Sequence, residues 1–156
     1  MKKRTALRAG LLLAGSFLPA LAGADDARQV AATHVAQWNS AFAKGKVDDI
    51  VALYADGAML VQPDGEVSKG TGQIRAFWVN LIGQNRGLLT VDIEDVKGEK
   101  EDTVITKTTL SDVQTLQNTQ HVMKYNYAGV LYSVLKRQSD GSWKAQVQQW
   151  SNKARS

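Results

Sequence analysis

The hydrophobic period of the sequence changes once, from helical to strand spacing, and this change limits the fold more than any other feature. Three segments, 27–44, 47–55 and 71–83, repeat apolar residues every three or four positions. From Leu89 onward, apolar residues alternate with polar ones, as strands with one buried face do. Helices followed by a run of antiparallel strands predict an α+β domain with its helices on one side of the sheet.

Turn residues divide the second half and the segment between the helices into strands. Pro63-Asp64-Gly65 and Ser139-Asp140-Gly141-Ser142 are typical of tight turns, and Gln117-Asn118-Thr119 is expected to reverse the chain as well. The expected strands are 58–62, 66–69, 89–94, 103–116, 121–137 and 143–151, and a loop is expected at 94–102.

The first 24 residues predict a secretory signal peptide. A basic start precedes a short apolar stretch, residues 9–21, and the small residues that follow fit cleavage after Ala22 or Ala24. An uncleaved anchor is the alternative, but the apolar stretch is too short to span a bilayer. We therefore expect one domain over residues 25–156, secreted or periplasmic, with no membrane insertion after cleavage.

The charge of the chain changes when this leader is set aside. The whole sequence has a formal net charge of +4, with 19 basic and 15 acidic residues. Residues 1–24 hold four of the basic residues and none of the acidic ones, so the remainder is formally neutral. With no basic cluster left, nucleic acid is not expected as a partner. The chain has no cysteine, which excludes disulfides and thiolate metal sites.

Three stretches carry a family resemblance. They are "ALYADGAMLVQPDG" at 52–65, "IRAFW" at 74–78 and "SDGSWKAQVQQWS" at 139–151. In their order and spacing, the chain from Val30 to Asn152 resembles the nuclear transport factor 2-like superfamily. It is most similar there to small exported proteins of the SnoaL-like, domain-of-unknown-function 4440 type. The resemblance implies a cystatin-like cone, in which a strongly bent antiparallel sheet wraps around a long helix and leaves a pocket at the open end.

The same resemblance, combined with the alternation of the strands, indicates which side chains face the pocket. Aromatic rings with a few amides and a histidine suit a small uncharged organic ligand. The competing interpretation is that the tryptophans only fill the core. The expected pocket residues are Trp38, Tyr54, Gln62, Trp78, His121, Tyr125, Tyr127, Ser133, Gln148 and Trp150.

Steroid isomerases of this fold provide a test for catalysis. The resemblance places their carboxylate base at Gln62, their phenol at Trp38 and their protonated carboxylic acid at Ser133. None of these three residues can do the same chemistry, since an amide cannot abstract a proton near neutral pH. His121 and Asp92 remain as candidate bases.

Three functions stay open on these grounds. The first is an exported small-ligand-binding domain. The second is an isomerase, cyclase or dehydratase that uses His121 or Asp92 as base and Gln62 or Tyr125 as hydrogen-bond donor. The third is an interaction module with a filled cone. No cofactor is expected, and no metal, because the two histidines, His34 and His121, lie on different elements without a third ligand nearby.

The side of the long strand opposite the pocket is also apolar. Val130, Tyr132 and Val134 lie on it, although a sheet covered by helices on one side is usually polar on the other. We therefore expect a homodimer through these three residues.

Overall fold

The computed structural model describes residues 24–84, 88–113 and 129–152. The described residues form three helices and six strands. The helices are α1 (Ala24–Lys44), α2 (Val47–Val51) and α3 (Gly70–Gln84). The strands are β1 (Tyr54–Val61), β2 (Val67–Lys69), β3 (Leu88–Lys100), β4 (Thr103–Val113), β5 (Gly129–Arg137) and β6 (Trp143–Asn152).

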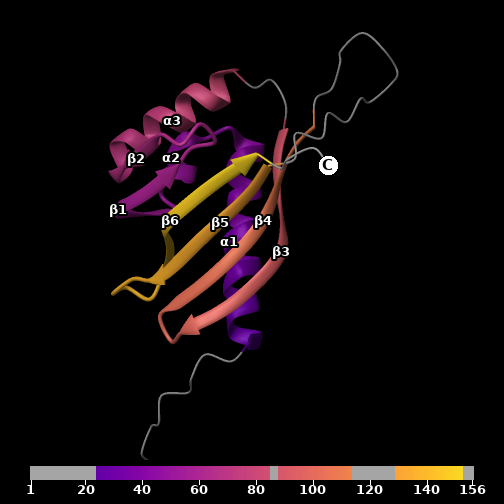
Figure 1. Ribbon diagram of the computed structural model, residues 1–156, viewed down its shortest axis with the longest axis vertical. Coiled ribbons are helices and arrows are strands. Elements are labelled where there is room, and N and C mark those ends of the chain that lie inside the picture. The colour runs from indigo at the N-terminus through magenta and orange to yellow at the C-terminus, as the bar shows by residue number, and fades with distance from the viewer. Residues whose placement is uncertain (1–23, 85–87, 114–128, 153–156) are drawn as a thin grey trace, which may run out of the picture.

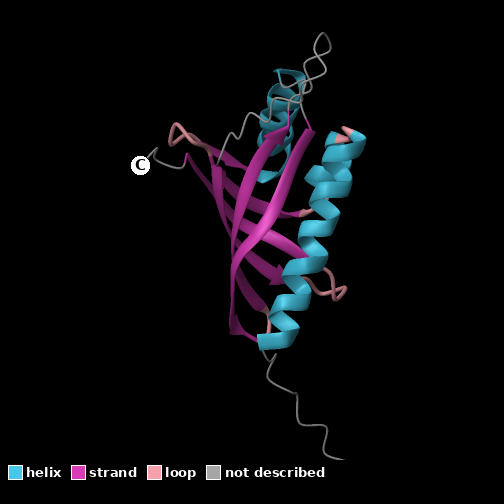
Figure 2. Cartoon of the chain, turned by 90° about the vertical axis from the view of Figure 1, so that its right-hand side faces the viewer, coloured by secondary structure: helices cyan, strands magenta, loops and turns pink. Residues whose placement is uncertain are grey.

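The strands form a single curled sheet in the order β2-β1-β6-β5-β4-β3. All neighbours are antiparallel except β1 and β6, which run parallel. Helix α1 runs along one side of the bent sheet and packs mainly against β3, while α3 packs on β1 and β2 (Figures 1 and 2). The predicted α+β architecture of a bent sheet around a long helix is confirmed. The predicted signal peptide, residues 1–24, lies almost wholly outside the described residues.

Helix α1 is positioned by one buried face. Ala27, Ala31, His34, Trp38 and Ala41 recur at intervals of three or four residues and are all nearly inaccessible to solvent. The helix ends where the next residue, a glycine at position 45, takes a φ of +62°, a conformation that favours glycine.

The second helix is shorter than the sequence predicts. Residues 47–55 have helical spacing, yet α2 ends at Val51 and Tyr54 already belongs to β1. The reason is a tertiary contact, because the amide of Ala145 donates a 2.8 Å hydrogen bond to the carbonyl of Leu53. Pairing with β6 thus holds the backbone extended where local propensity favours a helix.

The predicted loop at 94–102 is largely a strand. β3 continues to Lys100 and pairs with β4 down to Thr103, with irregularities next to Glu94 and Glu99. The charged side chains suggested a loop, but they lie on an exposed part of the strand while β4 satisfies the backbone. The predicted strands 103–116 and 121–137 are seen as β4 and β5 within the described residues, and 114–128 lie outside them.

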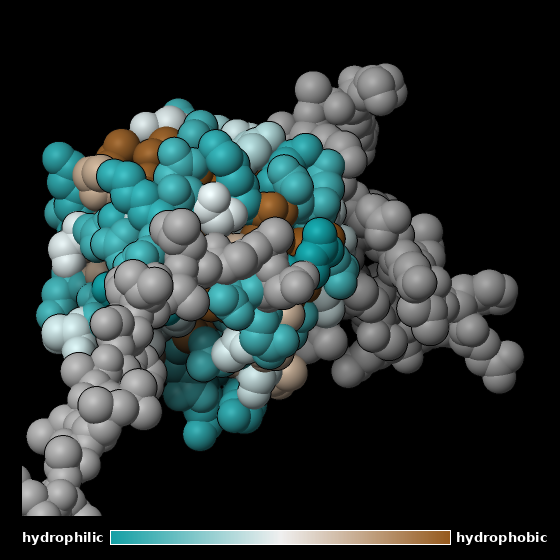
Figure 3. All heavy atoms as spheres, turned by 90° about the horizontal axis from the view of Figure 1, so that it is seen from below, coloured by the Kyte–Doolittle hydropathy of each residue, from teal (hydrophilic) through white to brown (hydrophobic). Residues whose placement is uncertain are grey.

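Aromatic rings fill the wide part of the space between α1, α3 and the sheet, which we call the cone. Trp78 contacts Trp38 at a ring-centroid distance of 5.3 Å and stacks on Trp150 at 6.5 Å. Gly129 makes this packing possible, since a Cβ there would lie 2.4 Å from Nε1 of Trp150. Seen from the end where α1 begins, the surface of the described residues is mainly hydrophilic with small hydrophobic patches (Figure 3).

Candidate functional site

A chain of buried hydrogen bonds crosses the cone and joins four elements. Nε1 of Trp78 on α3 donates to the phenol oxygen of Tyr54 on β1 over 3.1 Å. Tyr54 donates to Oε1 of Gln148 on β6 over 2.5 Å, and Nε2 of Gln148 donates to Oγ of Ser133 on β5 over 3.1 Å. The indole nitrogen of Trp78 can only donate, whereas the oxygen of the Gln148 amide can only accept and its nitrogen can only donate. For this reason the hydrogen bonds run in one direction, from Trp78 to Ser133. The hydroxyl hydrogen of Ser133 is therefore left to donate elsewhere.

Burial keeps the phenol of Tyr54 in this hydrogen-bond chain neutral. Desolvation raises the pKa of the Tyr54 phenol well above its usual range, an effect that the hydrogen bond from Trp78 only partly opposes. Tyr54 thus remains a protonated donor at any physiological pH.

A buried histidine on α1 supplies a second donor. Nε1 of Trp38 donates to Nε2 of His34 over 2.9 Å, so the proton of the neutral imidazole must reside on Nδ1. Nδ1 is buried and has no hydrogen-bond partner among the described residues. Burial lowers the pKa of His34 to about 4, so the ring is uncharged at neutral pH.

His34 and Ser133 meet at a small internal space, which we call the inner cavity. Its volume is about 10 Å³, room for about one water-sized group. None of its described lining side chains is charged, so it suits a neutral group that accepts hydrogen bonds. The lining residues are Ala31, His34, Val35, Trp38, Val91, Thr106, Thr108, Leu131, Ser133 and Gln148.

The structure brings together only part of the predicted pocket. Trp38, Ser133 and Gln148 line the inner cavity. Tyr54 belongs to the hydrogen-bond chain and helps to fill the core beside the inner cavity. Trp78 and Trp150 are buried in the aromatic cluster and fill the core there as well. His121, Tyr125 and Tyr127 lie outside the described residues.

Gln62 lies apart from the inner cavity. It follows β1 at the turn to β2, is half-buried, and donates from Nε2 to Oγ of Ser68 over 3.0 Å. Its backbone amide also pairs with the carbonyl of Glu66 over 2.8 Å. Both contacts brace the β1–β2 turn, and the described lining of the inner cavity does not include Gln62.

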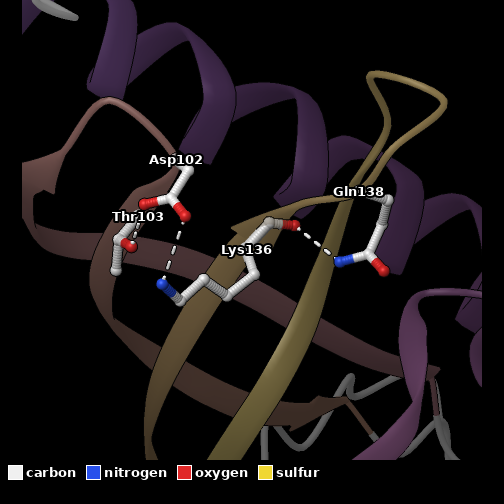
Figure 4. Close-up of polar contacts among 4 residues, drawn as sticks. All are labelled: Asp102, Thr103, Lys136 and Gln138. Carbon is white, nitrogen blue, oxygen red and sulfur yellow. Dashed lines mark hydrogen bonds and ion pairs between the residues drawn. The ribbon is translucent and has the colours of Figure 1, made fainter.

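Asp92 and Asp102 both lie at the surface of the sheet. Asp92, a predicted candidate base, is exposed on β3. Asp102, in the β3–β4 turn, accepts a hydrogen bond from Oγ1 of Thr103 over 2.8 Å and pairs with Nζ of Lys136 at 3.4 Å (Figure 4). The hydrogen bond from Thr103 and, to a lesser degree, the charge of Lys136 lower the pKa of Asp102. Asp102 is therefore an ionised, exposed carboxylate at the end of the sheet.

Three polar residues of the inner cavity are absent from the predicted pocket, although each left a signal in the sequence. His34 lies three residues after Ala31 and four before Trp38, so it falls on the buried face of α1. Thr106 and Thr108 alternate with the outward-facing residues of β4 and are buried. Polar residues on a buried face mark a site, since they need partners that an apolar core does not supply.

The predicted dimer residues differ in exposure. Tyr132 is 44% exposed, Val134 is half-buried, and Val130 is 7% exposed. No helix of the described residues is long and apolar enough to cross a membrane. Within the same residues, no three His, Cys, Asp or Glu side chains cluster as a metal site would require.

Residues 35–132 match the family model of the SnoaL-like domain. The chain belongs to the SnoaL-like domain family. The match includes Trp38 and β1 to β4, together with the start of β5. No curated protein matches the sequence of this SnoaL-like chain significantly.

Solved structures share the fold of this SnoaL-like domain at low sequence identity. A domain of unknown function with a cystatin-like fold, from Nostoc punctiforme, superposes with a TM-score of 0.69 at 14% identity, over 83% of this chain and 78% of its own. A ketosteroid isomerase-like protein from Erwinia carotovora gives 0.62 at 15%, over 83% and 95%. A nuclear transport factor 2-like protein from Streptomyces avermitilis, provisionally assigned as a dehydratase, gives 0.67 at 16%, over 84% and 99%. At these identities the likeness shows the fold alone.

Proposed function

We propose that this SnoaL-like domain binds a small uncharged organic molecule whose hydrogen-bond acceptor, such as a carbonyl oxygen, enters the inner cavity. The observation that carries the proposal is the direction of the buried hydrogen-bond chain, which leaves the Ser133 hydroxyl as a donor at the inner cavity. His34 contributes a second donor that has no partner among the described residues. Two donors in a buried, uncharged space favour an acceptor group, because unpaired buried donors cost free energy.

The size of the inner cavity sets the scale of the contact. About 10 Å³ admits a single oxygen atom of a ligand, or one water, and not a whole organic molecule. The acceptor group would therefore enter this space while the rest of the ligand lies outside it. Water would occupy the same position when no ligand is bound.

Binding is better supported than catalysis by acid and base. The described lining of the inner cavity holds no carboxylate, and the lowered pKa of His34 makes its imidazole a weak base. The isomerase, cyclase or dehydratase alternative therefore depends on His121, which is outside the described residues, or on the exposed Asp92. We retain this alternative because two structural neighbours are named as isomerase-like and dehydratase proteins, and because the fold supports many activities.

A dimer is the second part of the proposal. On the outer face of the sheet, Met59, Val147, Val134 and Ile105 are successive cross-strand neighbours on β1, β6, β5 and β4. Tyr132 lies next to this row and is largely exposed. An apolar row across four strands supports a homodimer through this face, as the sequence predicts at Val134 and Tyr132. The filled aromatic core would serve an interaction module equally well.

The ligand proposal is tested with acetophenone and cyclohexanone, two small neutral ketones. Nuclear magnetic resonance titration of the ¹⁵N-labelled protein should shift the amides of Ser133, Thr108 and Gln148. Ser133→Ala, which removes the donor, should weaken binding by about tenfold. Ser139→Ala, at an exposed serine of the β5–β6 turn, is the matched control and should leave the affinity unchanged. Failure of both ketones to shift these amides would contradict the proposal.

A further inference from the structure

A groove lies on the flank of α1, between this helix and the hairpin that joins β5 to β6. Its volume is about 280 Å³, close to that of small-molecule sites. Neither the function prediction nor the proposed contact in the inner cavity includes it. We call it the outer groove, and it is lined by Gln29, Val30, Thr33, His34, Gln37, Ser142 and Trp143.

The hairpin wall of the outer groove is rigidly built. The amide of Gln138 donates to the carbonyl of Ser142 over 2.7 Å, and the Asp140 carboxylate accepts from both the amide and the hydroxyl of Ser142, over 2.9 and 2.6 Å. Nε2 of Gln138 donates to the carbonyl of Lys136 over 3.0 Å (Figure 4). These bonds fix the position of Ser142 and of Trp143 after it.

Trp143 gives this wall an aromatic surface. Its ring is half-buried and lies 5.1 Å from the guanidinium carbon of Arg137, which holds the ring in a cation–π contact. A ring fixed in this way can stack on a flat ligand at little cost in side-chain entropy.

His34 connects the outer groove with the inner cavity. It lines both spaces, and no other described residue is shared between the two linings. The other described side chains of the groove lining are amides, hydroxyls, a valine and a tryptophan, and none of these carries a charge. Of the nearby charges, that of Arg137 is engaged with Trp143. That of Asp140 is engaged with Ser142. A neutral ligand can use both the polar and the apolar side chains of this described lining.

We propose that the outer groove holds the body of the bound ligand and is its way in, and that the ligand is a neutral, planar molecule with a carbonyl or carboxamide group. Its ring packs on Trp143, and its acceptor oxygen is directed toward His34. This inference rests on the proposed function for the existence of a ligand, but apart from His34 it assigns a separate set of residues. The ligand would therefore enter along the flank of α1.

Benzamide is the probe, since it is neutral, planar and carries one carboxamide. Titrated into the ¹⁵N-labelled protein, it should shift the indole signal of Trp143 and the amides of Thr33, Gln37 and Ser142. Thr33→Arg places a long charged side chain in the groove and should weaken binding by about tenfold or more. Ser40→Arg is the matched control, because Ser40 is also an exposed hydroxyl residue of α1 but does not line the groove. It should leave the affinity within about twofold.

The outcomes separate this inference from the proposed function. Shifts confined to Ser133, Thr108 and Gln148, with the same affinity in Thr33→Arg, would overturn the groove and leave the inner contact in place. Shifts in the groove that Ser133→Ala does not weaken would support the groove and count against the inner contact. Benzoate or benzylammonium binding more tightly than benzamide would overturn the neutral class, and no shift of the groove signals by benzamide would overturn the inference.

Discussion

Tyr54 and Gln148 are joined by a buried hydrogen bond of 2.5 Å, which connects the first residue of β1 to β6 across 94 positions of sequence. Because Trp78 donates to the same phenol oxygen, Tyr54 is both acceptor and donor and cannot be replaced by a residue with only one of these abilities. The arrangement sets the orientation of the Gln148 amide, and through it the free hydrogen of Ser133.

Tyr54→Phe tests this relationship. The substitution preserves the ring but leaves Oε1 of Gln148 and Nε1 of Trp78 unpaired in the core, which should destabilise the fold by about 1–3 kcal/mol. Urea unfolding monitored by circular dichroism measures the difference. Ser139→Ala, at an exposed serine of the β5–β6 turn, is the control, and it should change stability by less than about 0.5 kcal/mol. Equal effects of the two substitutions would show that the buried chain contributes little.

The lowered pKa of His34 predicts that the folded protein loses stability in mild acid. The ordinary pKa of His34 is 6.5 and burial lowers it to about 4, so between these values the unfolded chain binds a proton that the folded protein does not. Stability is therefore full above about pH 6.5 and falls as the pH drops toward 4. The described lining of the inner cavity holds no charged group that would offset the effect.

The size of this effect can be isolated with His34→Gln, which retains an acceptor for Trp38 but does not titrate. Between about pH 7.5 and about pH 4.5, the wild type should lose about 2–3 kcal/mol more unfolding free energy than the variant. Urea titrations at the two pH values give both numbers. A variant that loses as much as the wild type would assign the acid sensitivity to other groups.

Substitutions at Gln62 distinguish a structural role of this residue from a role in ligand binding. In the structure it braces the β1–β2 turn through Ser68, which is itself buried. Gln62→Leu should therefore lower the unfolding free energy by about 0.5–1.5 kcal/mol and leave ketone binding unchanged. Ser68→Ala should cost a similar amount, and the double variant should cost less than the sum. Weakened ketone binding at unchanged stability would instead return Gln62 to the predicted pocket.

Val134 tests the proposed homodimer. Val134→Lys would introduce a charge into the centre of the apolar row on the outer face of the sheet, where an unpaired buried charge is costly. Light scattering should report a dimer for the wild type at micromolar concentration and a monomer for the variant. Ser139→Lys, at the exposed hairpin turn, is the control for added charge and should remain dimeric. A monomeric wild type would refute the dimer.

Export is tested at the N-terminus. Cleavage after Ala22 or Ala24 predicts a mature chain that begins with Gly23 or Asp25, found outside the cytoplasm. Intact mass of the exported protein decides between the two sites. The full-length chain in a membrane fraction would contradict the prediction.

The periodicity of apolar residues in the sequence predicted much of the fold and less of the candidate site. Alternation along β5 correctly placed Ser133 inside, because a strand has a fixed period of two. In β6 the same rule fails, because a register shift next to Gln146 breaks the period, and the amide of Gln146 bonds to the backbone of β1 outside the cone. Local periodicity cannot report such an irregularity.

The site was harder to predict because it depends on packing between distant elements. The aromatic residues were expected to line a pocket, yet Trp38, Tyr54 and Trp78 are almost fully buried against one another. Whether rings line a space or fill it depends on the distance between α1, α3 and the sheet, which no single element of the sequence encodes. The outer groove depends in the same way on where the hairpin meets α1.

The parallel pairing of β1 with β6 has a consequence for the order of folding. β1 precedes every other strand of the described residues and β6 follows them all, so the middle of the sheet cannot close until β6 has been synthesised. Pairings of such long sequence separation are slow to form. During synthesis, β1 and β2 must therefore wait for β6, because β6 pairs with the edge of β1 that β2 leaves open.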